Sequence, residues 1–172
     1  VDIVTYNDIE TIANKAGSNG IDIVEFLISP NLGEPLKPLK KVISGGEMSR
    51  FMLAIKKITA QIDGVNVMVF DEIDTGISGK IAQVVANKLY DISNSKQVLA
   101  VTHLPQLASM ADAHYLIEKT TDNLRTNTNV KLLNSNQSAF EIAKMIDGIS
   151  ASESAVLHAS KLIEIANNYK SN

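Results

Sequence analysis

The sequence has 172 residues, of which 45% are hydrophobic and 20% charged, and these proportions are typical of a globular protein with a sizeable core. It has no cysteine, which excludes disulfide bonds and thiolate metal sites, and its formal net charge of -3 argues against a nucleic-acid surface spread over the whole chain. No apolar run approaches the roughly 18 residues that span a bilayer, so the sequence predicts a soluble protein with a single domain, residues 1–172.

Strand and helix patterns alternate along the chain. We expect strands at 1–6, 20–29, 65–70 and 97–102, helices at 8–17, 44–63, 80–92, 104–112, 139–148 and 151–170, a loop at 30–41 and a β-hairpin at 113–134. The two middle strands are continuous apolar runs, which is typical of buried parallel strands. The predicted fold class is therefore α/β, with a parallel sheet core, flanking helices and a β-hairpin.

Two carboxylates follow the first of these apolar strands, because VMVF runs directly into Asp71 and Glu72. Chemistry in parallel sheets gathers at the carboxyl ends of the strands. A carboxylate there can hold Mg²⁺ through water, and its neighbour can orient or deprotonate a water molecule beside a phosphate. The alternative is that both acids only begin the next turn, so this pair needs support from elsewhere in the chain.

A glycine pair upstream, in ISGGEMSR at 43–50, offers that support. Ser44 and Glu47 have the spacing of a capping box, so helix initiation alone could explain them. A capping box does not need Gly45 and Gly46, however, and glycine costs helix stability. Two glycines expose the first backbone N–H groups of a helix, where an anion such as phosphate binds well. Anion binding is the favoured interpretation and plain capping the alternative.

A histidine follows the second apolar strand, in AVTHLP. We expect His103 to lie near Glu72, because the ends of neighbouring parallel strands are close in space, although a lone histidine at such a position is usually an ordinary loop residue. The sequence contains no P-loop, G-x-x-x-x-G-K-[ST], and DTGISGKI is a false match. These residues therefore make sense as one half of a nucleotide site.

The motifs resemble those of ABC-type ATPases in order and spacing. Ser44 to Glu47 resembles the signature motif, Val67 to Glu72 the Walker B strand, Asp74 the D-loop acid and His103 the switch histidine. Longer stretches such as FDEIDTGISGKIA and VTHLPQLA resemble the C-terminal ATPase lobe of the RecN family, SMC-like ATPases of bacterial DNA double-strand-break repair. The resemblance covers roughly residues 21–165.

In that family the P-loop belongs to a separate N-terminal lobe. Because this chain also opens in mid-pattern without an initiator methionine, we expect it to be a C-terminal lobe excised from a longer protein, with the P-loop lobe absent. The isolated lobe is then expected to be inactive.

The resemblance also implies roles for individual residues. Asp71 would hold Mg²⁺ through water, Glu72 would be the general base, and His103 would contact the γ-phosphate. Ser44, Gly45, Gly46 and Glu47 would bind ATP held by a second head, and Asp74 would link the two sites. The implied cofactors are ATP and Mg²⁺. The implied partners are the N-terminal P-loop lobe, a second head in a homodimer, and DNA, with no membrane, in a cytoplasmic protein associated with the nucleoid.

Departures from the general ABC pattern point toward RecN. Ile43 and Glu47 replace the usual Leu and Gln, and IDTGISG replaces the transporter-like SALD.

Two other classes remain open: a non-catalytic docking lobe, and an aspartic protease built on Asp74-Thr75-Gly76, which would need an all-β fold. A basic stretch, defined by Lys37, Lys40, Lys41, Arg50, Lys56 and Lys57, is interpreted as a solvated helix face and loop, with a local nucleic-acid surface as the alternative.

Overall fold

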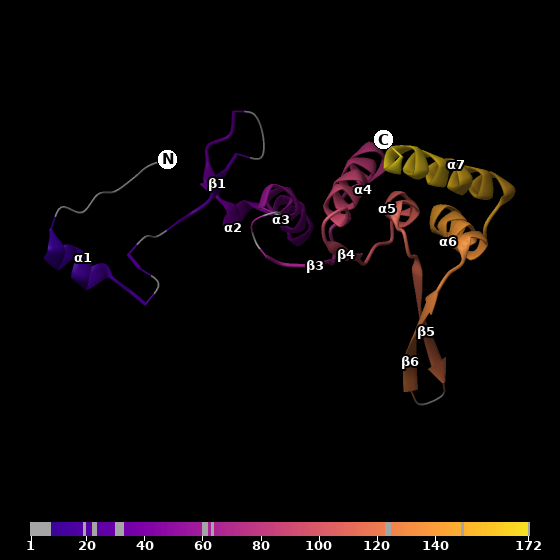
Figure 1. Ribbon diagram of the computed structural model, residues 1–172, viewed down its shortest axis with the longest axis horizontal. Coiled ribbons are helices and arrows are strands. Elements are labelled where there is room, and N and C mark those ends of the chain that lie inside the picture. Colours follow the sequence, from indigo (N-terminus) through magenta and orange to yellow (C-terminus); the bar gives the residue numbers. More distant parts are fainter. Residues whose placement is uncertain are drawn as a thin grey trace. The chain divides into compact units, whose positions relative to one another are not determined.

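The computed structural model describes residues 8–18, 20–21, 24–29, 33–59, 62, 64–122, 125–148 and 150–171. The chain divides into two units, residues 1–43 and residues 44–172 (Figure 1). The single-domain prediction stays a prediction. Among the described helices, none has the length and apolar character needed to cross a membrane.

The first unit contains short elements. They are α1 (Ile9–Lys15), β1 (Leu27–Ile28), β2 (Lys37–Pro38) and α2 (Leu39–Val42), with β1 antiparallel to β2. The helix expected at 8–17 is confirmed, and Asp8 caps it by accepting from the Thr11 N–H at 2.6 Å. Within the described part of the strand expected at 20–29, the strand pairing is limited to Leu27 and Ile28, and Gly20 forms an isolated bridge with Gly17. The expected loop at 30–41 contains β2 and the start of α2. The strand expected at 1–6 lies outside the described residues.

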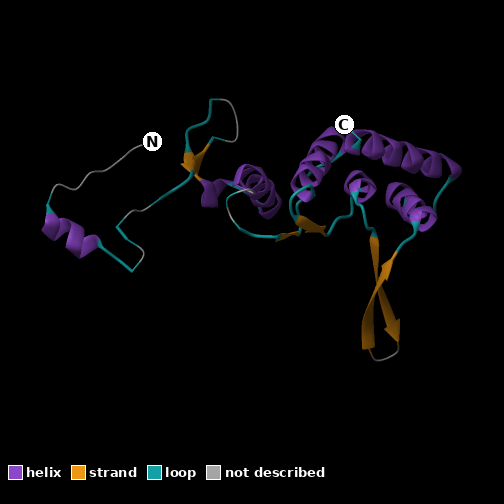
Figure 2. Ribbon diagram, in the orientation of Figure 1, coloured by secondary structure: helices purple, strands orange, loops and turns teal. Residues whose placement is uncertain are grey.

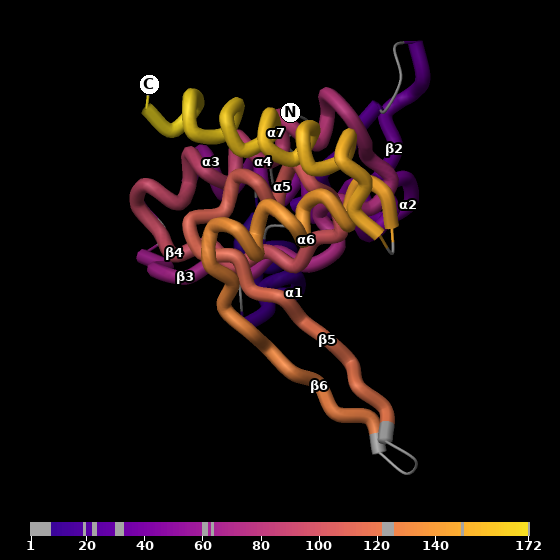
Figure 3. Tube along the Cα trace, turned by 90° about the vertical axis from the view of Figure 1, so that its right-hand side faces the viewer, coloured from indigo at the N-terminus to yellow at the C-terminus, as the bar shows by residue number. Residues whose placement is uncertain are grey.

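The second unit holds the predicted alternation of strands and helices (Figure 2). Its elements are α3 (Gly45–Thr59), β3 (Val67–Phe70), α4 (Gly79–Ser93), β4 (Gln97–Ala100), α5 (Pro105–Met110), β5 (Tyr115–Asp122), β6 (Arg125–Leu132), α6 (Ser135–Asp147) and α7 (Glu153–Lys170). The hairpin of β5 and β6 projects away from α5 and α6 (Figure 3). All elements predicted for this unit are present, with bounds shifted by a few residues.

Strands β3 and β4 pair in parallel, from Val67 opposite Gln97 to Phe70 opposite Ala100. The Val101 N–H donates to the Phe70 carbonyl at 3.0 Å and carries the pairing one residue further. This register brings the segments that follow the two strands to the same edge of the sheet, where the sequence predicted the site. Parallel pairing in the described residues is limited to these two strands, so a larger parallel core stays a prediction.

The core of the second unit lies under one face of the parallel pair. Its buried residues include Leu53, Met68, Phe70, Ile73, Val85, Leu89, Ile92 and Leu107. The other face of the pair is open, because Val67, Val69 and Leu99 are exposed, Val69 by 67%. The expectation that both strands are buried on both faces is wrong within the second unit, since no described element of that unit covers the second face. Four apolar residues in succession indicate a strand that is covered on both faces, but the sequence does not say what covers it.

Asp91 ties three helices of this unit together. From α4 it accepts from Lys57 Nζ of α3 at 2.5 Å and from the Tyr169 hydroxyl of α7 at 2.8 Å. Burial raises the pKa of Asp91, but the hydrogen bonds from Lys57 and Tyr169 outweigh burial and hold its pKa below the ordinary value. The ionised carboxylate is therefore the form that stabilises the fold.

We expect Asp91→Asn to lower the free energy of unfolding at neutral pH by about 1 kcal/mol, since a charged hydrogen bond is lost while the amide oxygen still accepts from Tyr169. The folded-state pKa is depressed, so this stabilisation is present above the unfolded-state pKa and is lost as the pH falls through the folded-state pKa. Urea unfolding of both proteins at neutral and acid pH measures the difference. A difference that grew on acidification would contradict this assignment.

Candidate functional site

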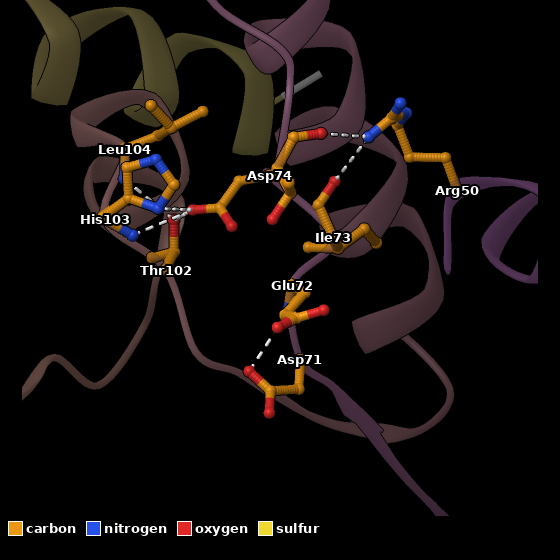
Figure 4. Close-up of polar contacts among 9 residues, drawn as sticks. Arg50, Asp71, Glu72, Ile73, Asp74, Thr102, His103 and Leu104 are labelled. Atoms are coloured by element: carbon orange, nitrogen blue, oxygen red, sulfur yellow. Dashed lines mark hydrogen bonds and ion pairs between the residues drawn. The ribbon is translucent and has the colours of Figure 1, made fainter. Parts of the chain in front are cut away.

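Glu72 has an unusual backbone conformation at the end of β3. Its φ is 56°, and it is the one non-glycine residue with positive φ in the part of the chain that the structure describes. Such a conformation costs roughly 1–3 kcal/mol and persists mostly where function requires it. The Glu72 N–H donates to Asp71 Oδ1 at 3.0 Å, and both side chains are exposed (Figure 4). The strained turn thus presents two adjacent carboxylates to solvent at the carboxyl end of β3.

The glycine pair at the start of α3 packs against the segment that follows β3. A Cβ atom added to Gly46 would lie 2.8 Å from the Thr75 carbonyl oxygen and 2.9 Å from Thr75 Cβ, which is closer than carbon atoms normally approach. A Cβ added to Gly45 would lie 3.5 Å from Glu72 Oε2, an ordinary contact. Gly46 is therefore required for the close approach of α3 to residues 71–76, a reason for glycine that the sequence interpretation missed.

Ser44 and Glu47 form the predicted capping box. Glu47 Oε2 accepts from the Ser44 N–H at 2.9 Å and from the Ser44 hydroxyl at 2.8 Å. These hydrogen bonds, the N–H first, lower the pKa of the exposed Glu47 carboxyl. Capping is thus present, and it is compatible with an anion site because the same arrangement fixes the first turn of α3, whose N-terminal end favours negative charge.

Two further side chains of α3 hold the segment after β3. Arg50 Nη1 donates to the Thr75 carbonyl at 2.7 Å and to the Ile73 carbonyl at 3.4 Å (Figure 4), and the Ser49 hydroxyl donates to the Asp71 carbonyl at 3.4 Å. Sequence reasoning missed both, since Arg50 was counted only as part of the basic stretch. With Arg50 engaged here and Lys57 bound to Asp91, the structure favours a structural role for these cations over a nucleic-acid surface.

Asp74 turns inward at the same edge of the sheet. Its side chain is 2% exposed, and its Oδ2 accepts from the Thr102 hydroxyl at 2.6 Å and from the His103 N–H at 2.8 Å. The ring atom His103 Nδ1 lies 3.1 Å from the same oxygen. Figure 4 shows Thr102 and His103 facing Asp74, whereas Glu72 lies with Asp71. His103 thus reaches the edge of the sheet as predicted, but its partner is Asp74 and not Glu72.

The aspartic-protease alternative does not fit this geometry. Asp74 follows the parallel strand β3 and precedes α4, and helices make up most of the described second unit, whereas that protease fold is all-β. The buried Asp74 carboxylate is also already occupied by Thr102 and His103.

The carboxylates open to a divalent cation at this edge of the sheet are those of Asp71 and Glu72. No group of three or more His, Cys, Asp or Glu side chains suited to a metal occurs among the described residues. Mg²⁺ in nucleotide sites usually takes one or two carboxylates and fills its other positions with water and phosphate oxygens. The exposed carboxylate of Asp71 fits a Mg²⁺ ion that arrives with a nucleotide.

Comparison with known proteins finds DNA repair proteins of bacteria among the relatives of this chain. Three of these relatives, each named DNA repair protein RecN, illustrate the likeness. The one from Halalkalibacterium halodurans is 48% identical over 154 residues, which are 90% of this chain and 27% of that protein. The one from Bacillus subtilis is 49% identical over 151 residues, 88% of this chain and 26% of that protein. The one from Treponema pallidum is 42% identical over 156 residues, 91% of this chain and 27% of that protein.

The resemblance to the RecN family is therefore confirmed, and the chain spans about a quarter of the length of the curated relatives it matches. No protein-family model matches the sequence. A solved structure described as "Structural biochemistry of ATP-driven dimerization and DNA stimulated activation of SMC ATPases" aligns with a TM-score of 0.47 and 21% identity, covering 80% of this chain and 87% of that one.

Proposed function

We propose that the chain is the C-terminal half of an SMC-like ATP-hydrolysing head that acts in DNA double-strand-break repair and recombination. The observation that carries the proposal is the gathering of three motifs around residues 71–76. The glycine pair of α3 packs on this segment, Asp71 and Glu72 begin it, and Asp74 joins it to His103. The RecN relatives support the role in repair.

In the proposed reaction the exposed Glu72 carboxylate takes a proton from a water molecule, whose oxygen attacks the γ-phosphorus of ATP. The new P–O bond forms as the bond to the β-phosphate oxygen breaks, and ADP leaves with that oxygen. His103 contacts the γ-phosphate, and Asp71 would hold Mg²⁺. Bound Mg²⁺ supplies positive charge that neutralises the phosphates.

The ATP in this reaction is held by a P-loop that the sequence does not contain. Ser44, Gly45 and Gly46 bind the ATP of a second head through the N-terminal turn of α3, where backbone N–H groups and the helix dipole favour phosphate. Both Ser44 donors are bonded to the Glu47 carboxylate in this structure, so their contact with a phosphate requires Glu47 to release them. Two heads therefore close around two nucleotides, and DNA binds the full-length protein.

The open face of the parallel pair is proposed as the contact with the N-terminal P-loop lobe. Val67, Val69, Leu99 and Val101 are exposed, and Val69 lies opposite Leu99 in the register. A groove of about 340 Å³ between α3 and β3 continues this apolar surface through Met48 and Met52. Parallel sheets in α/β proteins are covered on both faces. The cover proposed here corresponds to a part of the relatives that lies outside the matched residues.

The test is ATP hydrolysis by this chain alone and after co-expression with the P-loop lobe. We expect hydrolysis only in the mixture, with a rate per head that rises with head concentration, because two heads must meet. Association without hydrolysis would replace this proposal by the alternative, a non-catalytic docking lobe of an SMC-like protein. Hydrolysis by the chain alone at the rate of the mixture would contradict the half-site.

A further inference from the structure

The carboxylate of Asp74 gathers three donors on one oxygen atom. The Thr102 hydroxyl, the His103 N–H and His103 Nδ1 lie 2.6, 2.8 and 3.1 Å from Oδ2. Among the described residues, the buried polar or charged side chains are Asp74 and Ser109. A buried carboxylate is costly unless it is paired and hydrogen-bonded, so these contacts stabilise Asp74 in its position.

The hydrogen-bond directions around Asp74 decide which ring nitrogen of His103 carries a hydrogen. The Leu104 N–H donates to Thr102 Oγ1 at 3.0 Å, which leaves the Thr102 hydroxyl hydrogen for Asp74. An ionised carboxylate only accepts hydrogen bonds, so Nδ1 must donate at the third contact. The hydrogen therefore lies on Nδ1, and Nε2 is the ring nitrogen left without this contact.

The exposure of His103 directs Nε2 to the outside. The side chain is 72% exposed although its Nδ1 edge is fixed to a buried group (Figure 4). A ring held at Nδ1 by a carboxylate has a fixed tautomer and orientation, as when carboxylates orient catalytic or metal-binding histidines.

We propose that Asp74 is a positioning residue for His103, which fixes the Nδ1–H tautomer and presents Nε2 to a phosphate oxygen. The identity of that ligand rests on the proposed ATPase function, whereas the tautomer does not. A neutral ring in this tautomer presents a lone pair, which does not bond to a phosphate oxygen. Contact with a phosphate oxygen therefore requires a hydrogen between Nε2 and that oxygen, carried either by the ring or by the phosphate, and in both cases the Asp74 carboxylate holds the Nδ1–H.

This assignment changes the role expected for Asp74. A carboxylate that is 2% exposed and bonded to Thr102 and His103 does not itself reach across an interface between heads. Asp74 acts on a second site through His103 and through the main chain that follows it. The Thr102 hydroxyl, just after β4, donates to the same carboxylate, so a substitution of Thr102 is a suitable control for a substitution of Asp74.

The first test is ¹⁵N NMR of the histidine rings in the 172-residue chain, at a pH well above the ordinary histidine pKa of roughly 6.5. The chain has 3 histidines, so the signals are few. We expect the His103 proton on Nδ1, whereas the exposed His158 exchanges between tautomers as free histidine does. A His103 proton on Nε2, or an averaged signal like that of His158, would overturn the proposal.

Two variants separate positioning from folding. Asp74→Ala should release the His103 tautomer, and Asp74→Asn should retain it because the amide oxygen still accepts. His114, whose Nδ1 lies 2.8 Å from the Ser138 hydroxyl in the same unit, reports whether the unit remains folded. A fixed Nδ1–H tautomer in folded Asp74→Ala would contradict the proposal. If Asp74→Ala does not fold, the wild-type tautomer decides the question.

The second test measures kcat and KM in the head completed by the P-loop lobe. We expect Asp74→Asn to lower kcat by about 10- to 100-fold with little change in KM, because the carboxylate charge that strengthens the bond to His103 Nδ1–H is lost. Thr102→Ala, which keeps that charge, should have a smaller effect on kcat. Equal kcat values for Asp74→Asn and wild type would refute the positioning role. A completed head inactive in every form would refute the proposed function and leave the NMR result standing.

Discussion

Gly46→Ala is expected to lower the free energy of unfolding of the second unit by about 1–3 kcal/mol, whereas Gly45→Ala is expected to leave it unchanged or raise it. Both glycines lie in the first turn of α3, where alanine is the better helix former by up to about 1 kcal/mol. Helix propensity alone therefore predicts that both variants are stabilised. The opposite sign at Gly46 comes from its contact with Thr75.

The geometry of that contact explains why little relaxation is possible. The Gly46 Cβ would meet a carbonyl oxygen and a Cβ atom, and neither is the mobile end of a long side chain. The Thr75 carbonyl is also the acceptor of the 2.7 Å bond from Arg50, so moving it disturbs a second contact. Gly45 faces the end of the Glu72 side chain at 3.5 Å, which is free of overlap and able to move.

Urea unfolding followed by far-UV circular dichroism measures this pair, because the chain has no tryptophan for fluorescence. If the urea midpoints of Gly46→Ala and Gly45→Ala shifted equally and in the same direction, the close approach of α3 to residues 71–76 would not contribute to stability. The expected result has a consequence for function. A substitution at Gly46 disturbs Glu72 and Asp74 in the same chain, so a loss of ATP hydrolysis in that variant does not by itself report contact with a second head.

Local patterns in the sequence were sufficient for most elements of the second unit. The predicted bounds of α4, β3, β4 and the hairpin each lie within a few residues of the observed bounds. Because a helix lies between β3 and β4 in the chain, the order of elements alone predicts that these two strands pair in parallel. The same patterns predicted that Asp71, Glu72 and His103 lie at one edge of the sheet, because these residues directly follow the ends of two parallel strands. Short pairings such as β1 with β2 were missed, since two residues give no period.

The contacts that shape the site were not visible in the sequence. Arg50 bonds to Thr75, 25 residues away, and Asp74 bonds to His103, 29 residues away, and neither pair has a local signal. The positive φ of Glu72 is also hidden, because non-glycine residues adopt it only when the surrounding structure compensates. The burial of Val67 and Val69 was mispredicted for a different reason. An apolar strand indicates that both of its faces are covered, but the sequence does not show whether the covering element belongs to the same 172 residues.

Glu72→Gln is expected to lower ATP hydrolysis by the completed head by roughly 100- to 10,000-fold, the range associated with the loss of a general base. Glutamine keeps the length of the side chain and meets the same backbone cost at positive φ, so the free energy of unfolding should not change. Binding of ATP and association of heads should also remain, because an amide in place of the carboxylate removes proton acceptance without removing contacts made by the glycine turn.

Steady-state hydrolysis, with head association measured by light scattering in ATP, tests both parts of this expectation. Glu164→Gln is the matched control, because Glu164 is exposed on α7, outside the proposed site, and the substitution changes the same charge. Parallel loss of hydrolysis and association would mean that Glu72 organises the interface and is not the base. Unchanged hydrolysis would mean that the strained turn serves another purpose. Because the backbone of Glu72 is retained in the variant, lost turnover with intact association assigns the effect to one carboxylate at the end of β3.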